Sequence, residues 1–136
     1  MNIDITQKFI EQHTEQILKI FETYQKIEIL FFMNLYLPKK LSIEELNKLL
    51  NTKTCGMIEK EYLRTFPDDK YGLKKLLRTV TQQRNSFMHS FWIFLALTEK
   101  KNLRINNELI LNDFQKNADE LLNIIIRFNE KIESKK

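Results

Sequence analysis

Three residues in the second half of the chain could do chemistry together: Arg84, Asn85 and His89. Histidine exchanges a proton near neutral pH, so it can serve as a general acid or base. Arginine stays charged, and its forked donors suit a phosphate group. On a helix, Asn85 and His89 share a face because they are four residues apart, and their side chains can meet.

A stripe of positive charge leads to these residues. Residues 70–84 contain five Lys and Arg and no Asp or Glu. On a helix, side chains three or four positions apart form one exposed row. Here the row consists of Lys70, Lys74, Arg78, Gln82, Asn85 and His89. A row of one sign that ends at a histidine can follow a phosphate backbone, although such rows are most often solvated faces.

Arg84 falls where a helix should be apolar. If residues 70–98 form one helix, Arg84 lies at the centre of a narrow apolar arc. The arc consists of Leu73, Leu77, Val80, Phe87, Phe91 and Leu95. A buried guanidinium is costly unless it is compensated. Either the apolar seam opens there, or Arg84 faces something polar. A purely structural interpretation is a buried arginine paired with an acid of a neighbouring helix, such as Glu15, Glu22 or Glu120.

Residues 87–97 are apolar nearly all round, apart from His89 and Ser90. A helix that is apolar on every side is buried on every side. A bundle of this size covers only one side, so we expect a second copy of the chain to cover the other. Asn85 and His89 are then expected beside a homodimer interface.

The rest of the chain predicts the scaffold. Its 136 residues, 43% of them hydrophobic, predict a single helical domain over 1–136, and its two Gly and two Pro exclude a turn-rich β fold. Long helical periodicities cover about 4–37, 70–98 and 106–132, and Pro38 ends the first. Their apolar seams include Ile20, Tyr24, Ile27, Phe31, Leu35, Phe94, Phe114, Ala118, Leu121, Ile125, Phe128 and Ile132.

Shorter helices complete the scaffold. Ser42 and Glu45 form a capping box that starts a helix over 42–50, and a second short helix is expected within 57–66. Asp68 or Asp69 is expected to cap the helix that carries Arg84. Together these segments predict an all-α, up-down bundle of about four to five helices, three of them long.

Several classes of protein are excluded or disfavoured. A lone Cys55 and two His exclude a disulfide framework and a Cys- or His-rich metal site, so we expect no metal or cofactor. The longest apolar run is far shorter than the roughly 20 residues of a membrane span, and the N-terminus lacks a secretion signal. We therefore expect a cytoplasmic protein without a membrane anchor. The net charge of +4 permits a phosphate-bearing partner.

The segment Arg84-Asn85-Ser86-Phe87-Met88-His89 resembles the R-x4-6-H motif of the HEPN superfamily (higher eukaryotes and prokaryotes nucleotide-binding). The residue after the motif arginine is often polar in that family, commonly Asn, as it is here. The family fold is an all-α bundle with the motif on a late helix, which agrees with the predicted layout. The resemblance is strict only over the motif, whereas the arrangement of the helices agrees loosely.

The resemblance implies a function. Many members are metal-independent endoribonucleases that act as homodimers, with two motifs facing across the interface. RNA supplies its own nucleophile, the 2′-OH. By this resemblance His89 is the acid or base, Arg84 clamps the phosphate, Asn85 positions His89 or substrate, and Ser86 is a weaker candidate. It also implies a toxin or abortive-infection role in phage defence or a toxin–antitoxin pair, with a nucleotidyltransferase-like antitoxin as partner.

Two other functions stay open. The chain could be a non-catalytic HEPN-like bundle that binds nucleotide, RNA or a protein partner. It could also be a helix-turn-helix DNA-binding regulator built on residues 42–66, although Glu59 and Glu61 suit a phosphate-lined groove poorly. His13, on the first apolar seam, is expected to be a core or rim residue.

Overall fold

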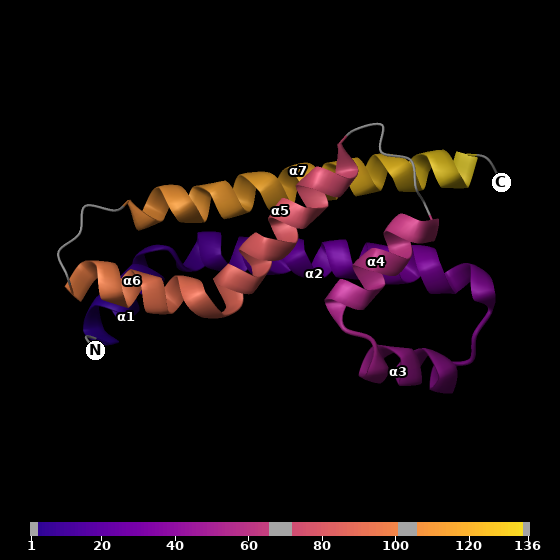
Figure 1. Cartoon of the computed structure of the whole chain (residues 1–136), viewed down its shortest axis with the longest axis horizontal. Helices are drawn as coiled ribbons and strands as arrows, with labels where there is room; N and C mark the ends of the chain where they lie inside the picture. Colours follow the sequence, from indigo (N-terminus) through magenta and orange to yellow (C-terminus); the bar gives the residue numbers. More distant parts are fainter. Residues whose placement is uncertain (1–2, 66–71, 101–105, 135–136) are drawn as a thin grey trace.

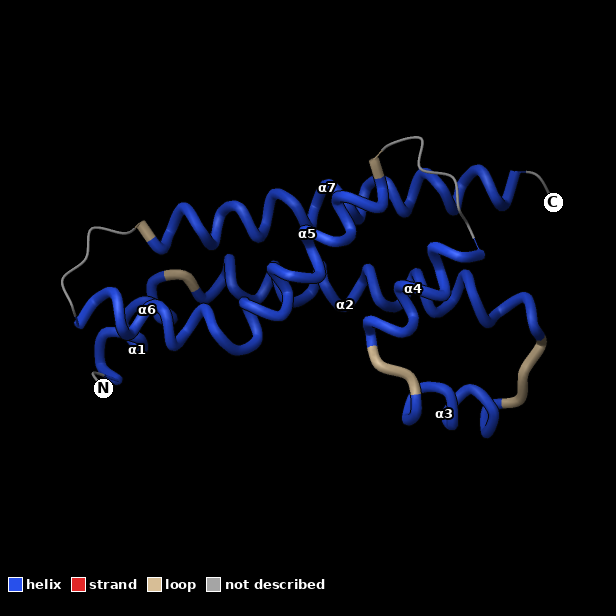
Figure 2. Tube along the Cα trace, in the orientation of Figure 1, coloured by secondary structure: helices blue, strands red, loops and turns tan. Residues whose placement is uncertain are grey.

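The computed structural model describes residues 3–65, 72–100 and 106–134. Within these ranges the chain is helical and contains no strand, so the predicted all-α class is confirmed (Figure 2). The α-helices are α1 (Ile3–Gln12), α2 (Thr14–Tyr36), α3 (Ile43–Thr52), α4 (Cys55–Thr65), α5 (Leu73–Asn85), α6 (Phe91–Lys100) and α7 (Asn107–Ser134). A 3-10 turn, η1 (Leu37–Lys39), follows α2, and a π-helical turn, η2 (Ser86–Ser90), joins α5 to α6.

The helices form an elongated bundle (Figure 1). The two longest, α2 and α7, lie side by side along it, and α5 packs on α7 while α4 packs on α2. Helix α1 contacts α6 at one end of the bundle, whereas α3 lies outside the bundle at the opposite end (Figure 1). Among the described residues, no helix combines the length and apolar character needed to cross a bilayer.

The core consists of apolar faces of α2, α5, α6 and α7, with Phe87 of η2 and with Ile58 and Tyr62 of α4. Periodic apolar residues become buried because these helices turn their apolar faces inward. The buried members include Ile20, Tyr24, Ile27, Phe31, Leu35, Leu73, Leu77, Val80, Phe87, Phe91, Leu95, Phe114, Ala118, Leu121 and Ile125. The prediction was wrong for Phe94, which is 41% exposed because no element of the described chain covers its side of α6. Phe128 and Ile132 lie outside the side chains that the structure describes.

The predicted first helix is broken at His13, which has φ −122° and ψ 20°. Its ring stacks on that of Phe9, with centroids 4.2 Å apart, and its Nδ1 lies 2.9 Å from the Phe9 carbonyl oxygen. The His13 backbone N–H still donates to the Phe9 carbonyl at 3.1 Å, so the break between α1 and α2 lies in the non-helical backbone angles of His13. His13 is therefore a partly buried rim residue, as predicted.

The other boundaries largely agree with the sequence. The capping box of α3 is confirmed, since the Ser42 hydroxyl accepts the Glu45 N–H and the Glu45 carboxylate accepts the Ser42 N–H. Helix α5 begins after Gly72, whose φ of +68° suits glycine. The predicted caps Asp68 and Asp69 lie outside the described residues. The breaks at His13 and η2 raise the number of described elements above the four to five predicted.

Candidate functional site

The candidate site is centred on η2, the π-helical turn of residues 86–90. The N–H of Phe91 donates to the Ser86 carbonyl, five residues back instead of four. Such turns insert one residue into a helix and are frequent at functional sites. Phe87 points into the core, whereas His89 is exposed on the outer side of the turn.

The π-turn is held by aromatic packing. The Phe87 ring contacts those of Tyr24, Phe114 and Trp92, with centroids 5.7–6.3 Å apart. The Trp92 indole N–H donates to the Phe87 carbonyl oxygen at 2.7 Å. The indole thus supplies a donor to the backbone where the helical ladder is irregular. This role of Trp92 is not evident from the sequence, because the pattern around it indicates only an apolar helix.

Arg84 lies inside the bundle, where the apolar arc predicted it. The residue is 9% exposed, and its Nη1 donates to Glu59 at 2.5 Å and lies 3.4 Å from a Glu28 oxygen. The second Glu59 oxygen accepts the Thr81 hydroxyl at 2.7 Å. Arg84 therefore ties α5 to α4 and α2. A burial of this kind is compensated by ion pairing and hydrogen bonds.

The acids that pair with Arg84 differ from those predicted. Glu28 and Glu59 bind it, rather than Glu15, Glu22 and Glu120. The sequence did carry a signal for Glu59. It adjoins Ile58 and lies one turn before Tyr62, and these two residues mark the buried face of α4.

The three motif residues do not converge within one chain. Asn85 and His89 are exposed, whereas the Arg84 guanidinium is turned inward. In the described part of the chain no hydrogen bond joins Asn85 to His89, although their spacing permits one. Ser86 is half-buried, and its hydroxyl accepts that of Ser90 at 3.3 Å. Positions five apart on a helix point about 140° apart, so this divergence is expected of one chain.

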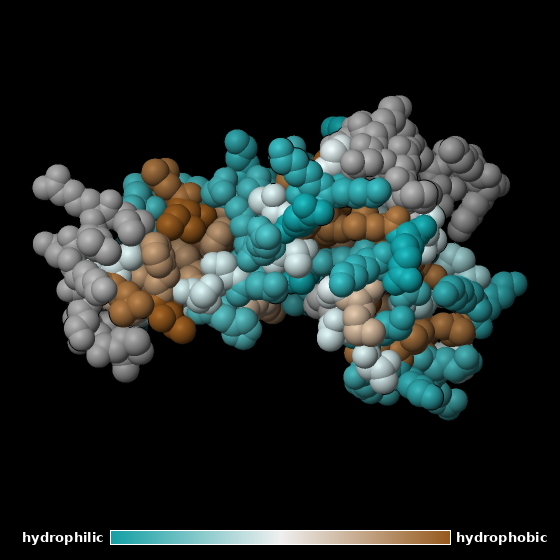
Figure 3. Space-filling view, in the orientation of Figure 1, coloured by the Kyte–Doolittle hydropathy of each residue, from teal (hydrophilic) through white to brown (hydrophobic). Residues whose placement is uncertain are grey.

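The polar row that leads to His89 is exposed along α5. Lys74, Arg78 and Gln82 all face solvent, as Asn85 and His89 do, and Lys70 lies outside the described residues. Figure 3 shows a hydrophilic surface over α5. The row is therefore accessible to a large polar partner.

Exposed hydrophobic residues lie on η2 and α6, close to His89 in the sequence. Figure 3 shows them gathered at the end of the molecule that α6 occupies. Exposed members on η2 and α6 are Met88, Ile93, Phe94 and Leu97, between 39% and 58% exposed. An apolar groove of about 320 Å³ adjoins them. Its lining comprises Ile10, Thr14, Ile17, Leu18, Phe21, Phe87, Met88 and Trp92.

The described residues contain no group of three or more His, Cys, Asp or Glu that could hold a metal ion. Comparisons with known proteins give no match, whether the chain is compared with protein-family models, with curated proteins or with solved structures. Membership of the HEPN superfamily thus stays a prediction based on the motif.

Proposed function

We propose that the chain is an HEPN-type endoribonuclease that cleaves RNA as a homodimer without a metal ion. The observation that carries this proposal is the position of His89. It stands exposed on a π-turn at the end of an accessible row that contains Lys74 and Arg78. A basic row can hold successive phosphates, and a histidine can move the proton that the reaction requires.

The reaction needs two proton transfers. The imidazole of one His89 accepts the proton of the ribose 2′-OH, whose oxygen forms a bond to phosphorus. The bond from phosphorus to the 5′ oxygen breaks, and the protonated imidazole of the second copy's His89 supplies a proton to that oxygen. The products are a 2′,3′-cyclic phosphate and a free 5′-OH. A two-fold axis beside η2 would supply both imidazoles.

The exposed apolar residues beside His89 support the dimer. Met88, Ile93 and Leu97 lie on or directly after the π-turn and face solvent in the single chain. Contiguous exposed apolar surface of this kind marks an interaction site. A second copy that covers it would bring the two η2 turns together.

Arg84 has a different role here from the one that the resemblance implies. Its guanidinium already pairs with Glu59 and Glu28, and separating a buried pair costs about 3–5 kcal/mol. We therefore propose Arg84 as a positioning residue that fixes the helix carrying His89. Lys74 and Arg78 would contact the RNA phosphates, and Asn85 would orient His89 or the substrate.

Purified protein incubated with single-stranded RNA in EDTA tests the proposal. Cleavage is expected to yield 2′,3′-cyclic phosphate ends, and DNA of the same sequence is expected to stay intact because it lacks the 2′-OH. Cleavage of the DNA, or dependence on added metal, would contradict the mechanism.

A second candidate function is supported by the ion pairs of Arg84. With that guanidinium engaged, the same surface could bind RNA without cleaving it. Binding that weakens steeply with salt, at a slope of about −0.7 per phosphate contact on a single strand, would indicate the basic row. Such binding without cleavage of any RNA favours this candidate. The toxin or phage-defence role and the antitoxin partner remain predictions from the resemblance.

A further inference from the structure

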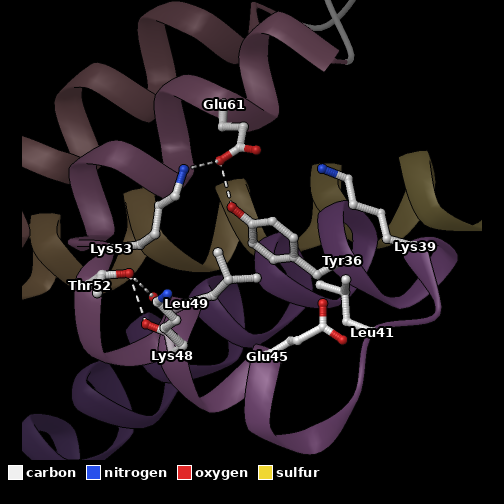
Figure 4. A pocket seen from close by; sticks show the side chains of 9 residues that line it. All are labelled: Tyr36, Lys39, Leu41, Glu45, Lys48, Leu49, Thr52, Lys53 and Glu61. Atoms are coloured by element: carbon white, nitrogen blue, oxygen red, sulfur yellow. Dashed lines mark hydrogen bonds and ion pairs between the residues drawn. The ribbon is translucent and has the colours of Figure 1, made fainter.

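A second hollow lies at the other end of the bundle, where α3 stands away from α2 and α4 (Figure 1). Its volume is about 530 Å³, within the range of about 300–1,000 Å³ usual for small-molecule sites. Figure 4 shows the side chains that line it. They belong to Tyr36, Lys39, Leu41, Glu45, Lys48, Leu49, Thr52, Lys53 and Glu61.

The hollow exists because α3 packs poorly. No residue of α3 is buried, and Ile43 at its start is 84% exposed. Leu41 and Leu49 pack only partly against the core. The space between α3 and the bundle is therefore left for another molecule to fill.

One wall of the hollow is a preformed polar cluster. A single Glu61 oxygen accepts the Tyr36 hydroxyl at 2.5 Å and the Lys53 ammonium at 3.0 Å. Tyr36 is only 2% exposed, so its hydroxyl is fixed in place. Lys39 flanks the cluster, with its Nζ 5.2 Å from the centre of the Tyr36 ring (Figure 4). The second Glu61 oxygen keeps acceptor capacity for a ligand.

The charges around the hollow leave a positive excess. Three lysines and two glutamates line it. Glu61 is compensated by Lys53, and Glu45 accepts the Ser42 backbone N–H in the capping box. Lys39 and Lys48 form no ion pair among the described residues. The three lysines and two glutamates give the lining a net charge of +1, which favours an anion over a cation.

The remaining wall is apolar. Leu41, Leu49 and the ring of Tyr36 face the space below the polar cluster (Figure 4). A ligand that fills the hollow must therefore be amphipathic. Its acidic group would lie near Lys39, which forms no ion pair in the described chain, and its apolar body would lie against the two leucines.

We propose that this pocket is a binding site for a small organic anion with an apolar body. The proposal does not depend on the endoribonuclease proposal, because the pocket and η2 lie at different ends of the molecule (Figure 1). Its occupant is defined by chemistry: one sulfonate, phosphate or carboxylate group attached to an apolar body.

The test uses 1-anilinonaphthalene-8-sulfonate as the probe and N-phenyl-1-naphthylamine as its neutral counterpart. Amide NMR spectra of the full chain locate the binding. The sulfonate is expected to shift signals of η1, of α3 and of the part of α4 around Glu61. It is expected to bind there at least about tenfold more tightly than the neutral compound, which corresponds to a difference of about 1.4 kcal/mol in binding free energy.

Lys39→Met is the informative variant because Lys39 is exposed and forms no ion pair in the described chain. It is expected to weaken sulfonate binding at the pocket about fivefold. Lys60→Met is the matched control, since Lys60 is an exposed lysine of α4 that does not line the pocket. It should leave the affinity unchanged.

Three results would overturn the proposal. They are signal shifts confined to the apolar groove around Met88 and Trp92, equal affinity for the charged and neutral probes, and equal weakening by Lys39→Met and Lys60→Met. Shifts at the pocket that depend on both the sulfonate and Lys39 would support it.

Discussion

Replacing Arg84 with methionine is expected to destabilise the fold by about 3 kcal/mol. The side chains of Arg84 and Glu59 are 11% and 8% exposed, so the change leaves a buried carboxylate without its cation. Loss of one partner of a buried pair costs about 3–5 kcal/mol. The lower end applies because Glu59 keeps the Thr81 hydroxyl as a donor and the Glu28 side chain, 25% exposed, is reached by water.

Urea unfolding followed by tryptophan fluorescence measures this loss. Trp92 is the only tryptophan, and its ring packs against Phe87 and Phe91 in the core. Glu59→Gln is expected to cost nearly as much as Arg84→Met. Glu28→Gln should cost less than about 1 kcal/mol because its ion pair is longer and more exposed.

The double variant Arg84→Met/Glu59→Gln separates pairing from packing. It is expected to lose less stability than the two single variants added together, because no buried charge is left unpaired. A loss below about 1 kcal/mol for Arg84→Met, or a larger loss for Glu28→Gln than for Glu59→Gln, would refute the structural role assigned to the pair.

Trp92→Phe removes the donor to the Phe87 carbonyl and should lower the free energy of unfolding by about 1 kcal/mol, measured by thermal unfolding followed by circular dichroism. An unchanged midpoint would show that the indole does not stabilise η2. Gly72→Ala places a side chain at φ +68° and should lower the free energy of unfolding by about 1–2 kcal/mol. Gly56→Ala is the control: it lies within α4 with open space around an added Cβ, and it should be neutral or stabilising. Equal effects of the two variants would contradict this reasoning. The Tyr36 hydroxyl, with help from Lys53, holds the pKa of Glu61 below its usual 4.5, so the ionised carboxylate stabilises the fold above pH 4.5 and this contribution is lost as the pH falls through the lowered pKa. The difference in unfolding free energy between wild type and Glu61→Gln should therefore shrink between about pH 6 and about pH 3, and a constant difference would contradict the coupling.

The long helices and their buried faces could be predicted from the sequence because apolar spacing alone determines them. Ile20, Tyr24 and Ile27 recur at helical intervals, and the structure buries all three. The burial of Arg84 followed from the same reasoning. Its partners did not, because the acid that reaches it depends on how α4 packs on α5, and Glu59 lies 25 residues away along the chain.

The irregular features could not be predicted because they depend on tertiary contacts. The residues of η2 are ordinary helix residues, and the extra residue in the turn is accommodated by Phe87 packing against three other aromatic rings. The break at His13 lies at a residue whose ring stacks on Phe9, a contact that residue types alone do not reveal. The pocket beside α3 depends on a helix standing away from the core, which the capping box of that helix does not reveal.

The rate of RNA cleavage in EDTA by His89→Ala, compared with wild type, tests the central claim most directly. General acid–base catalysis contributes about 10²–10⁴-fold, so the variant is expected to be at least about 100-fold slower while its circular dichroism spectrum is unchanged. Ser90→Ala is the matched control, since it changes a neighbouring exposed residue of η2 and should retain activity. Cleavage by His89→Ala at the wild-type rate would contradict the assignment of His89 as the group that moves the proton.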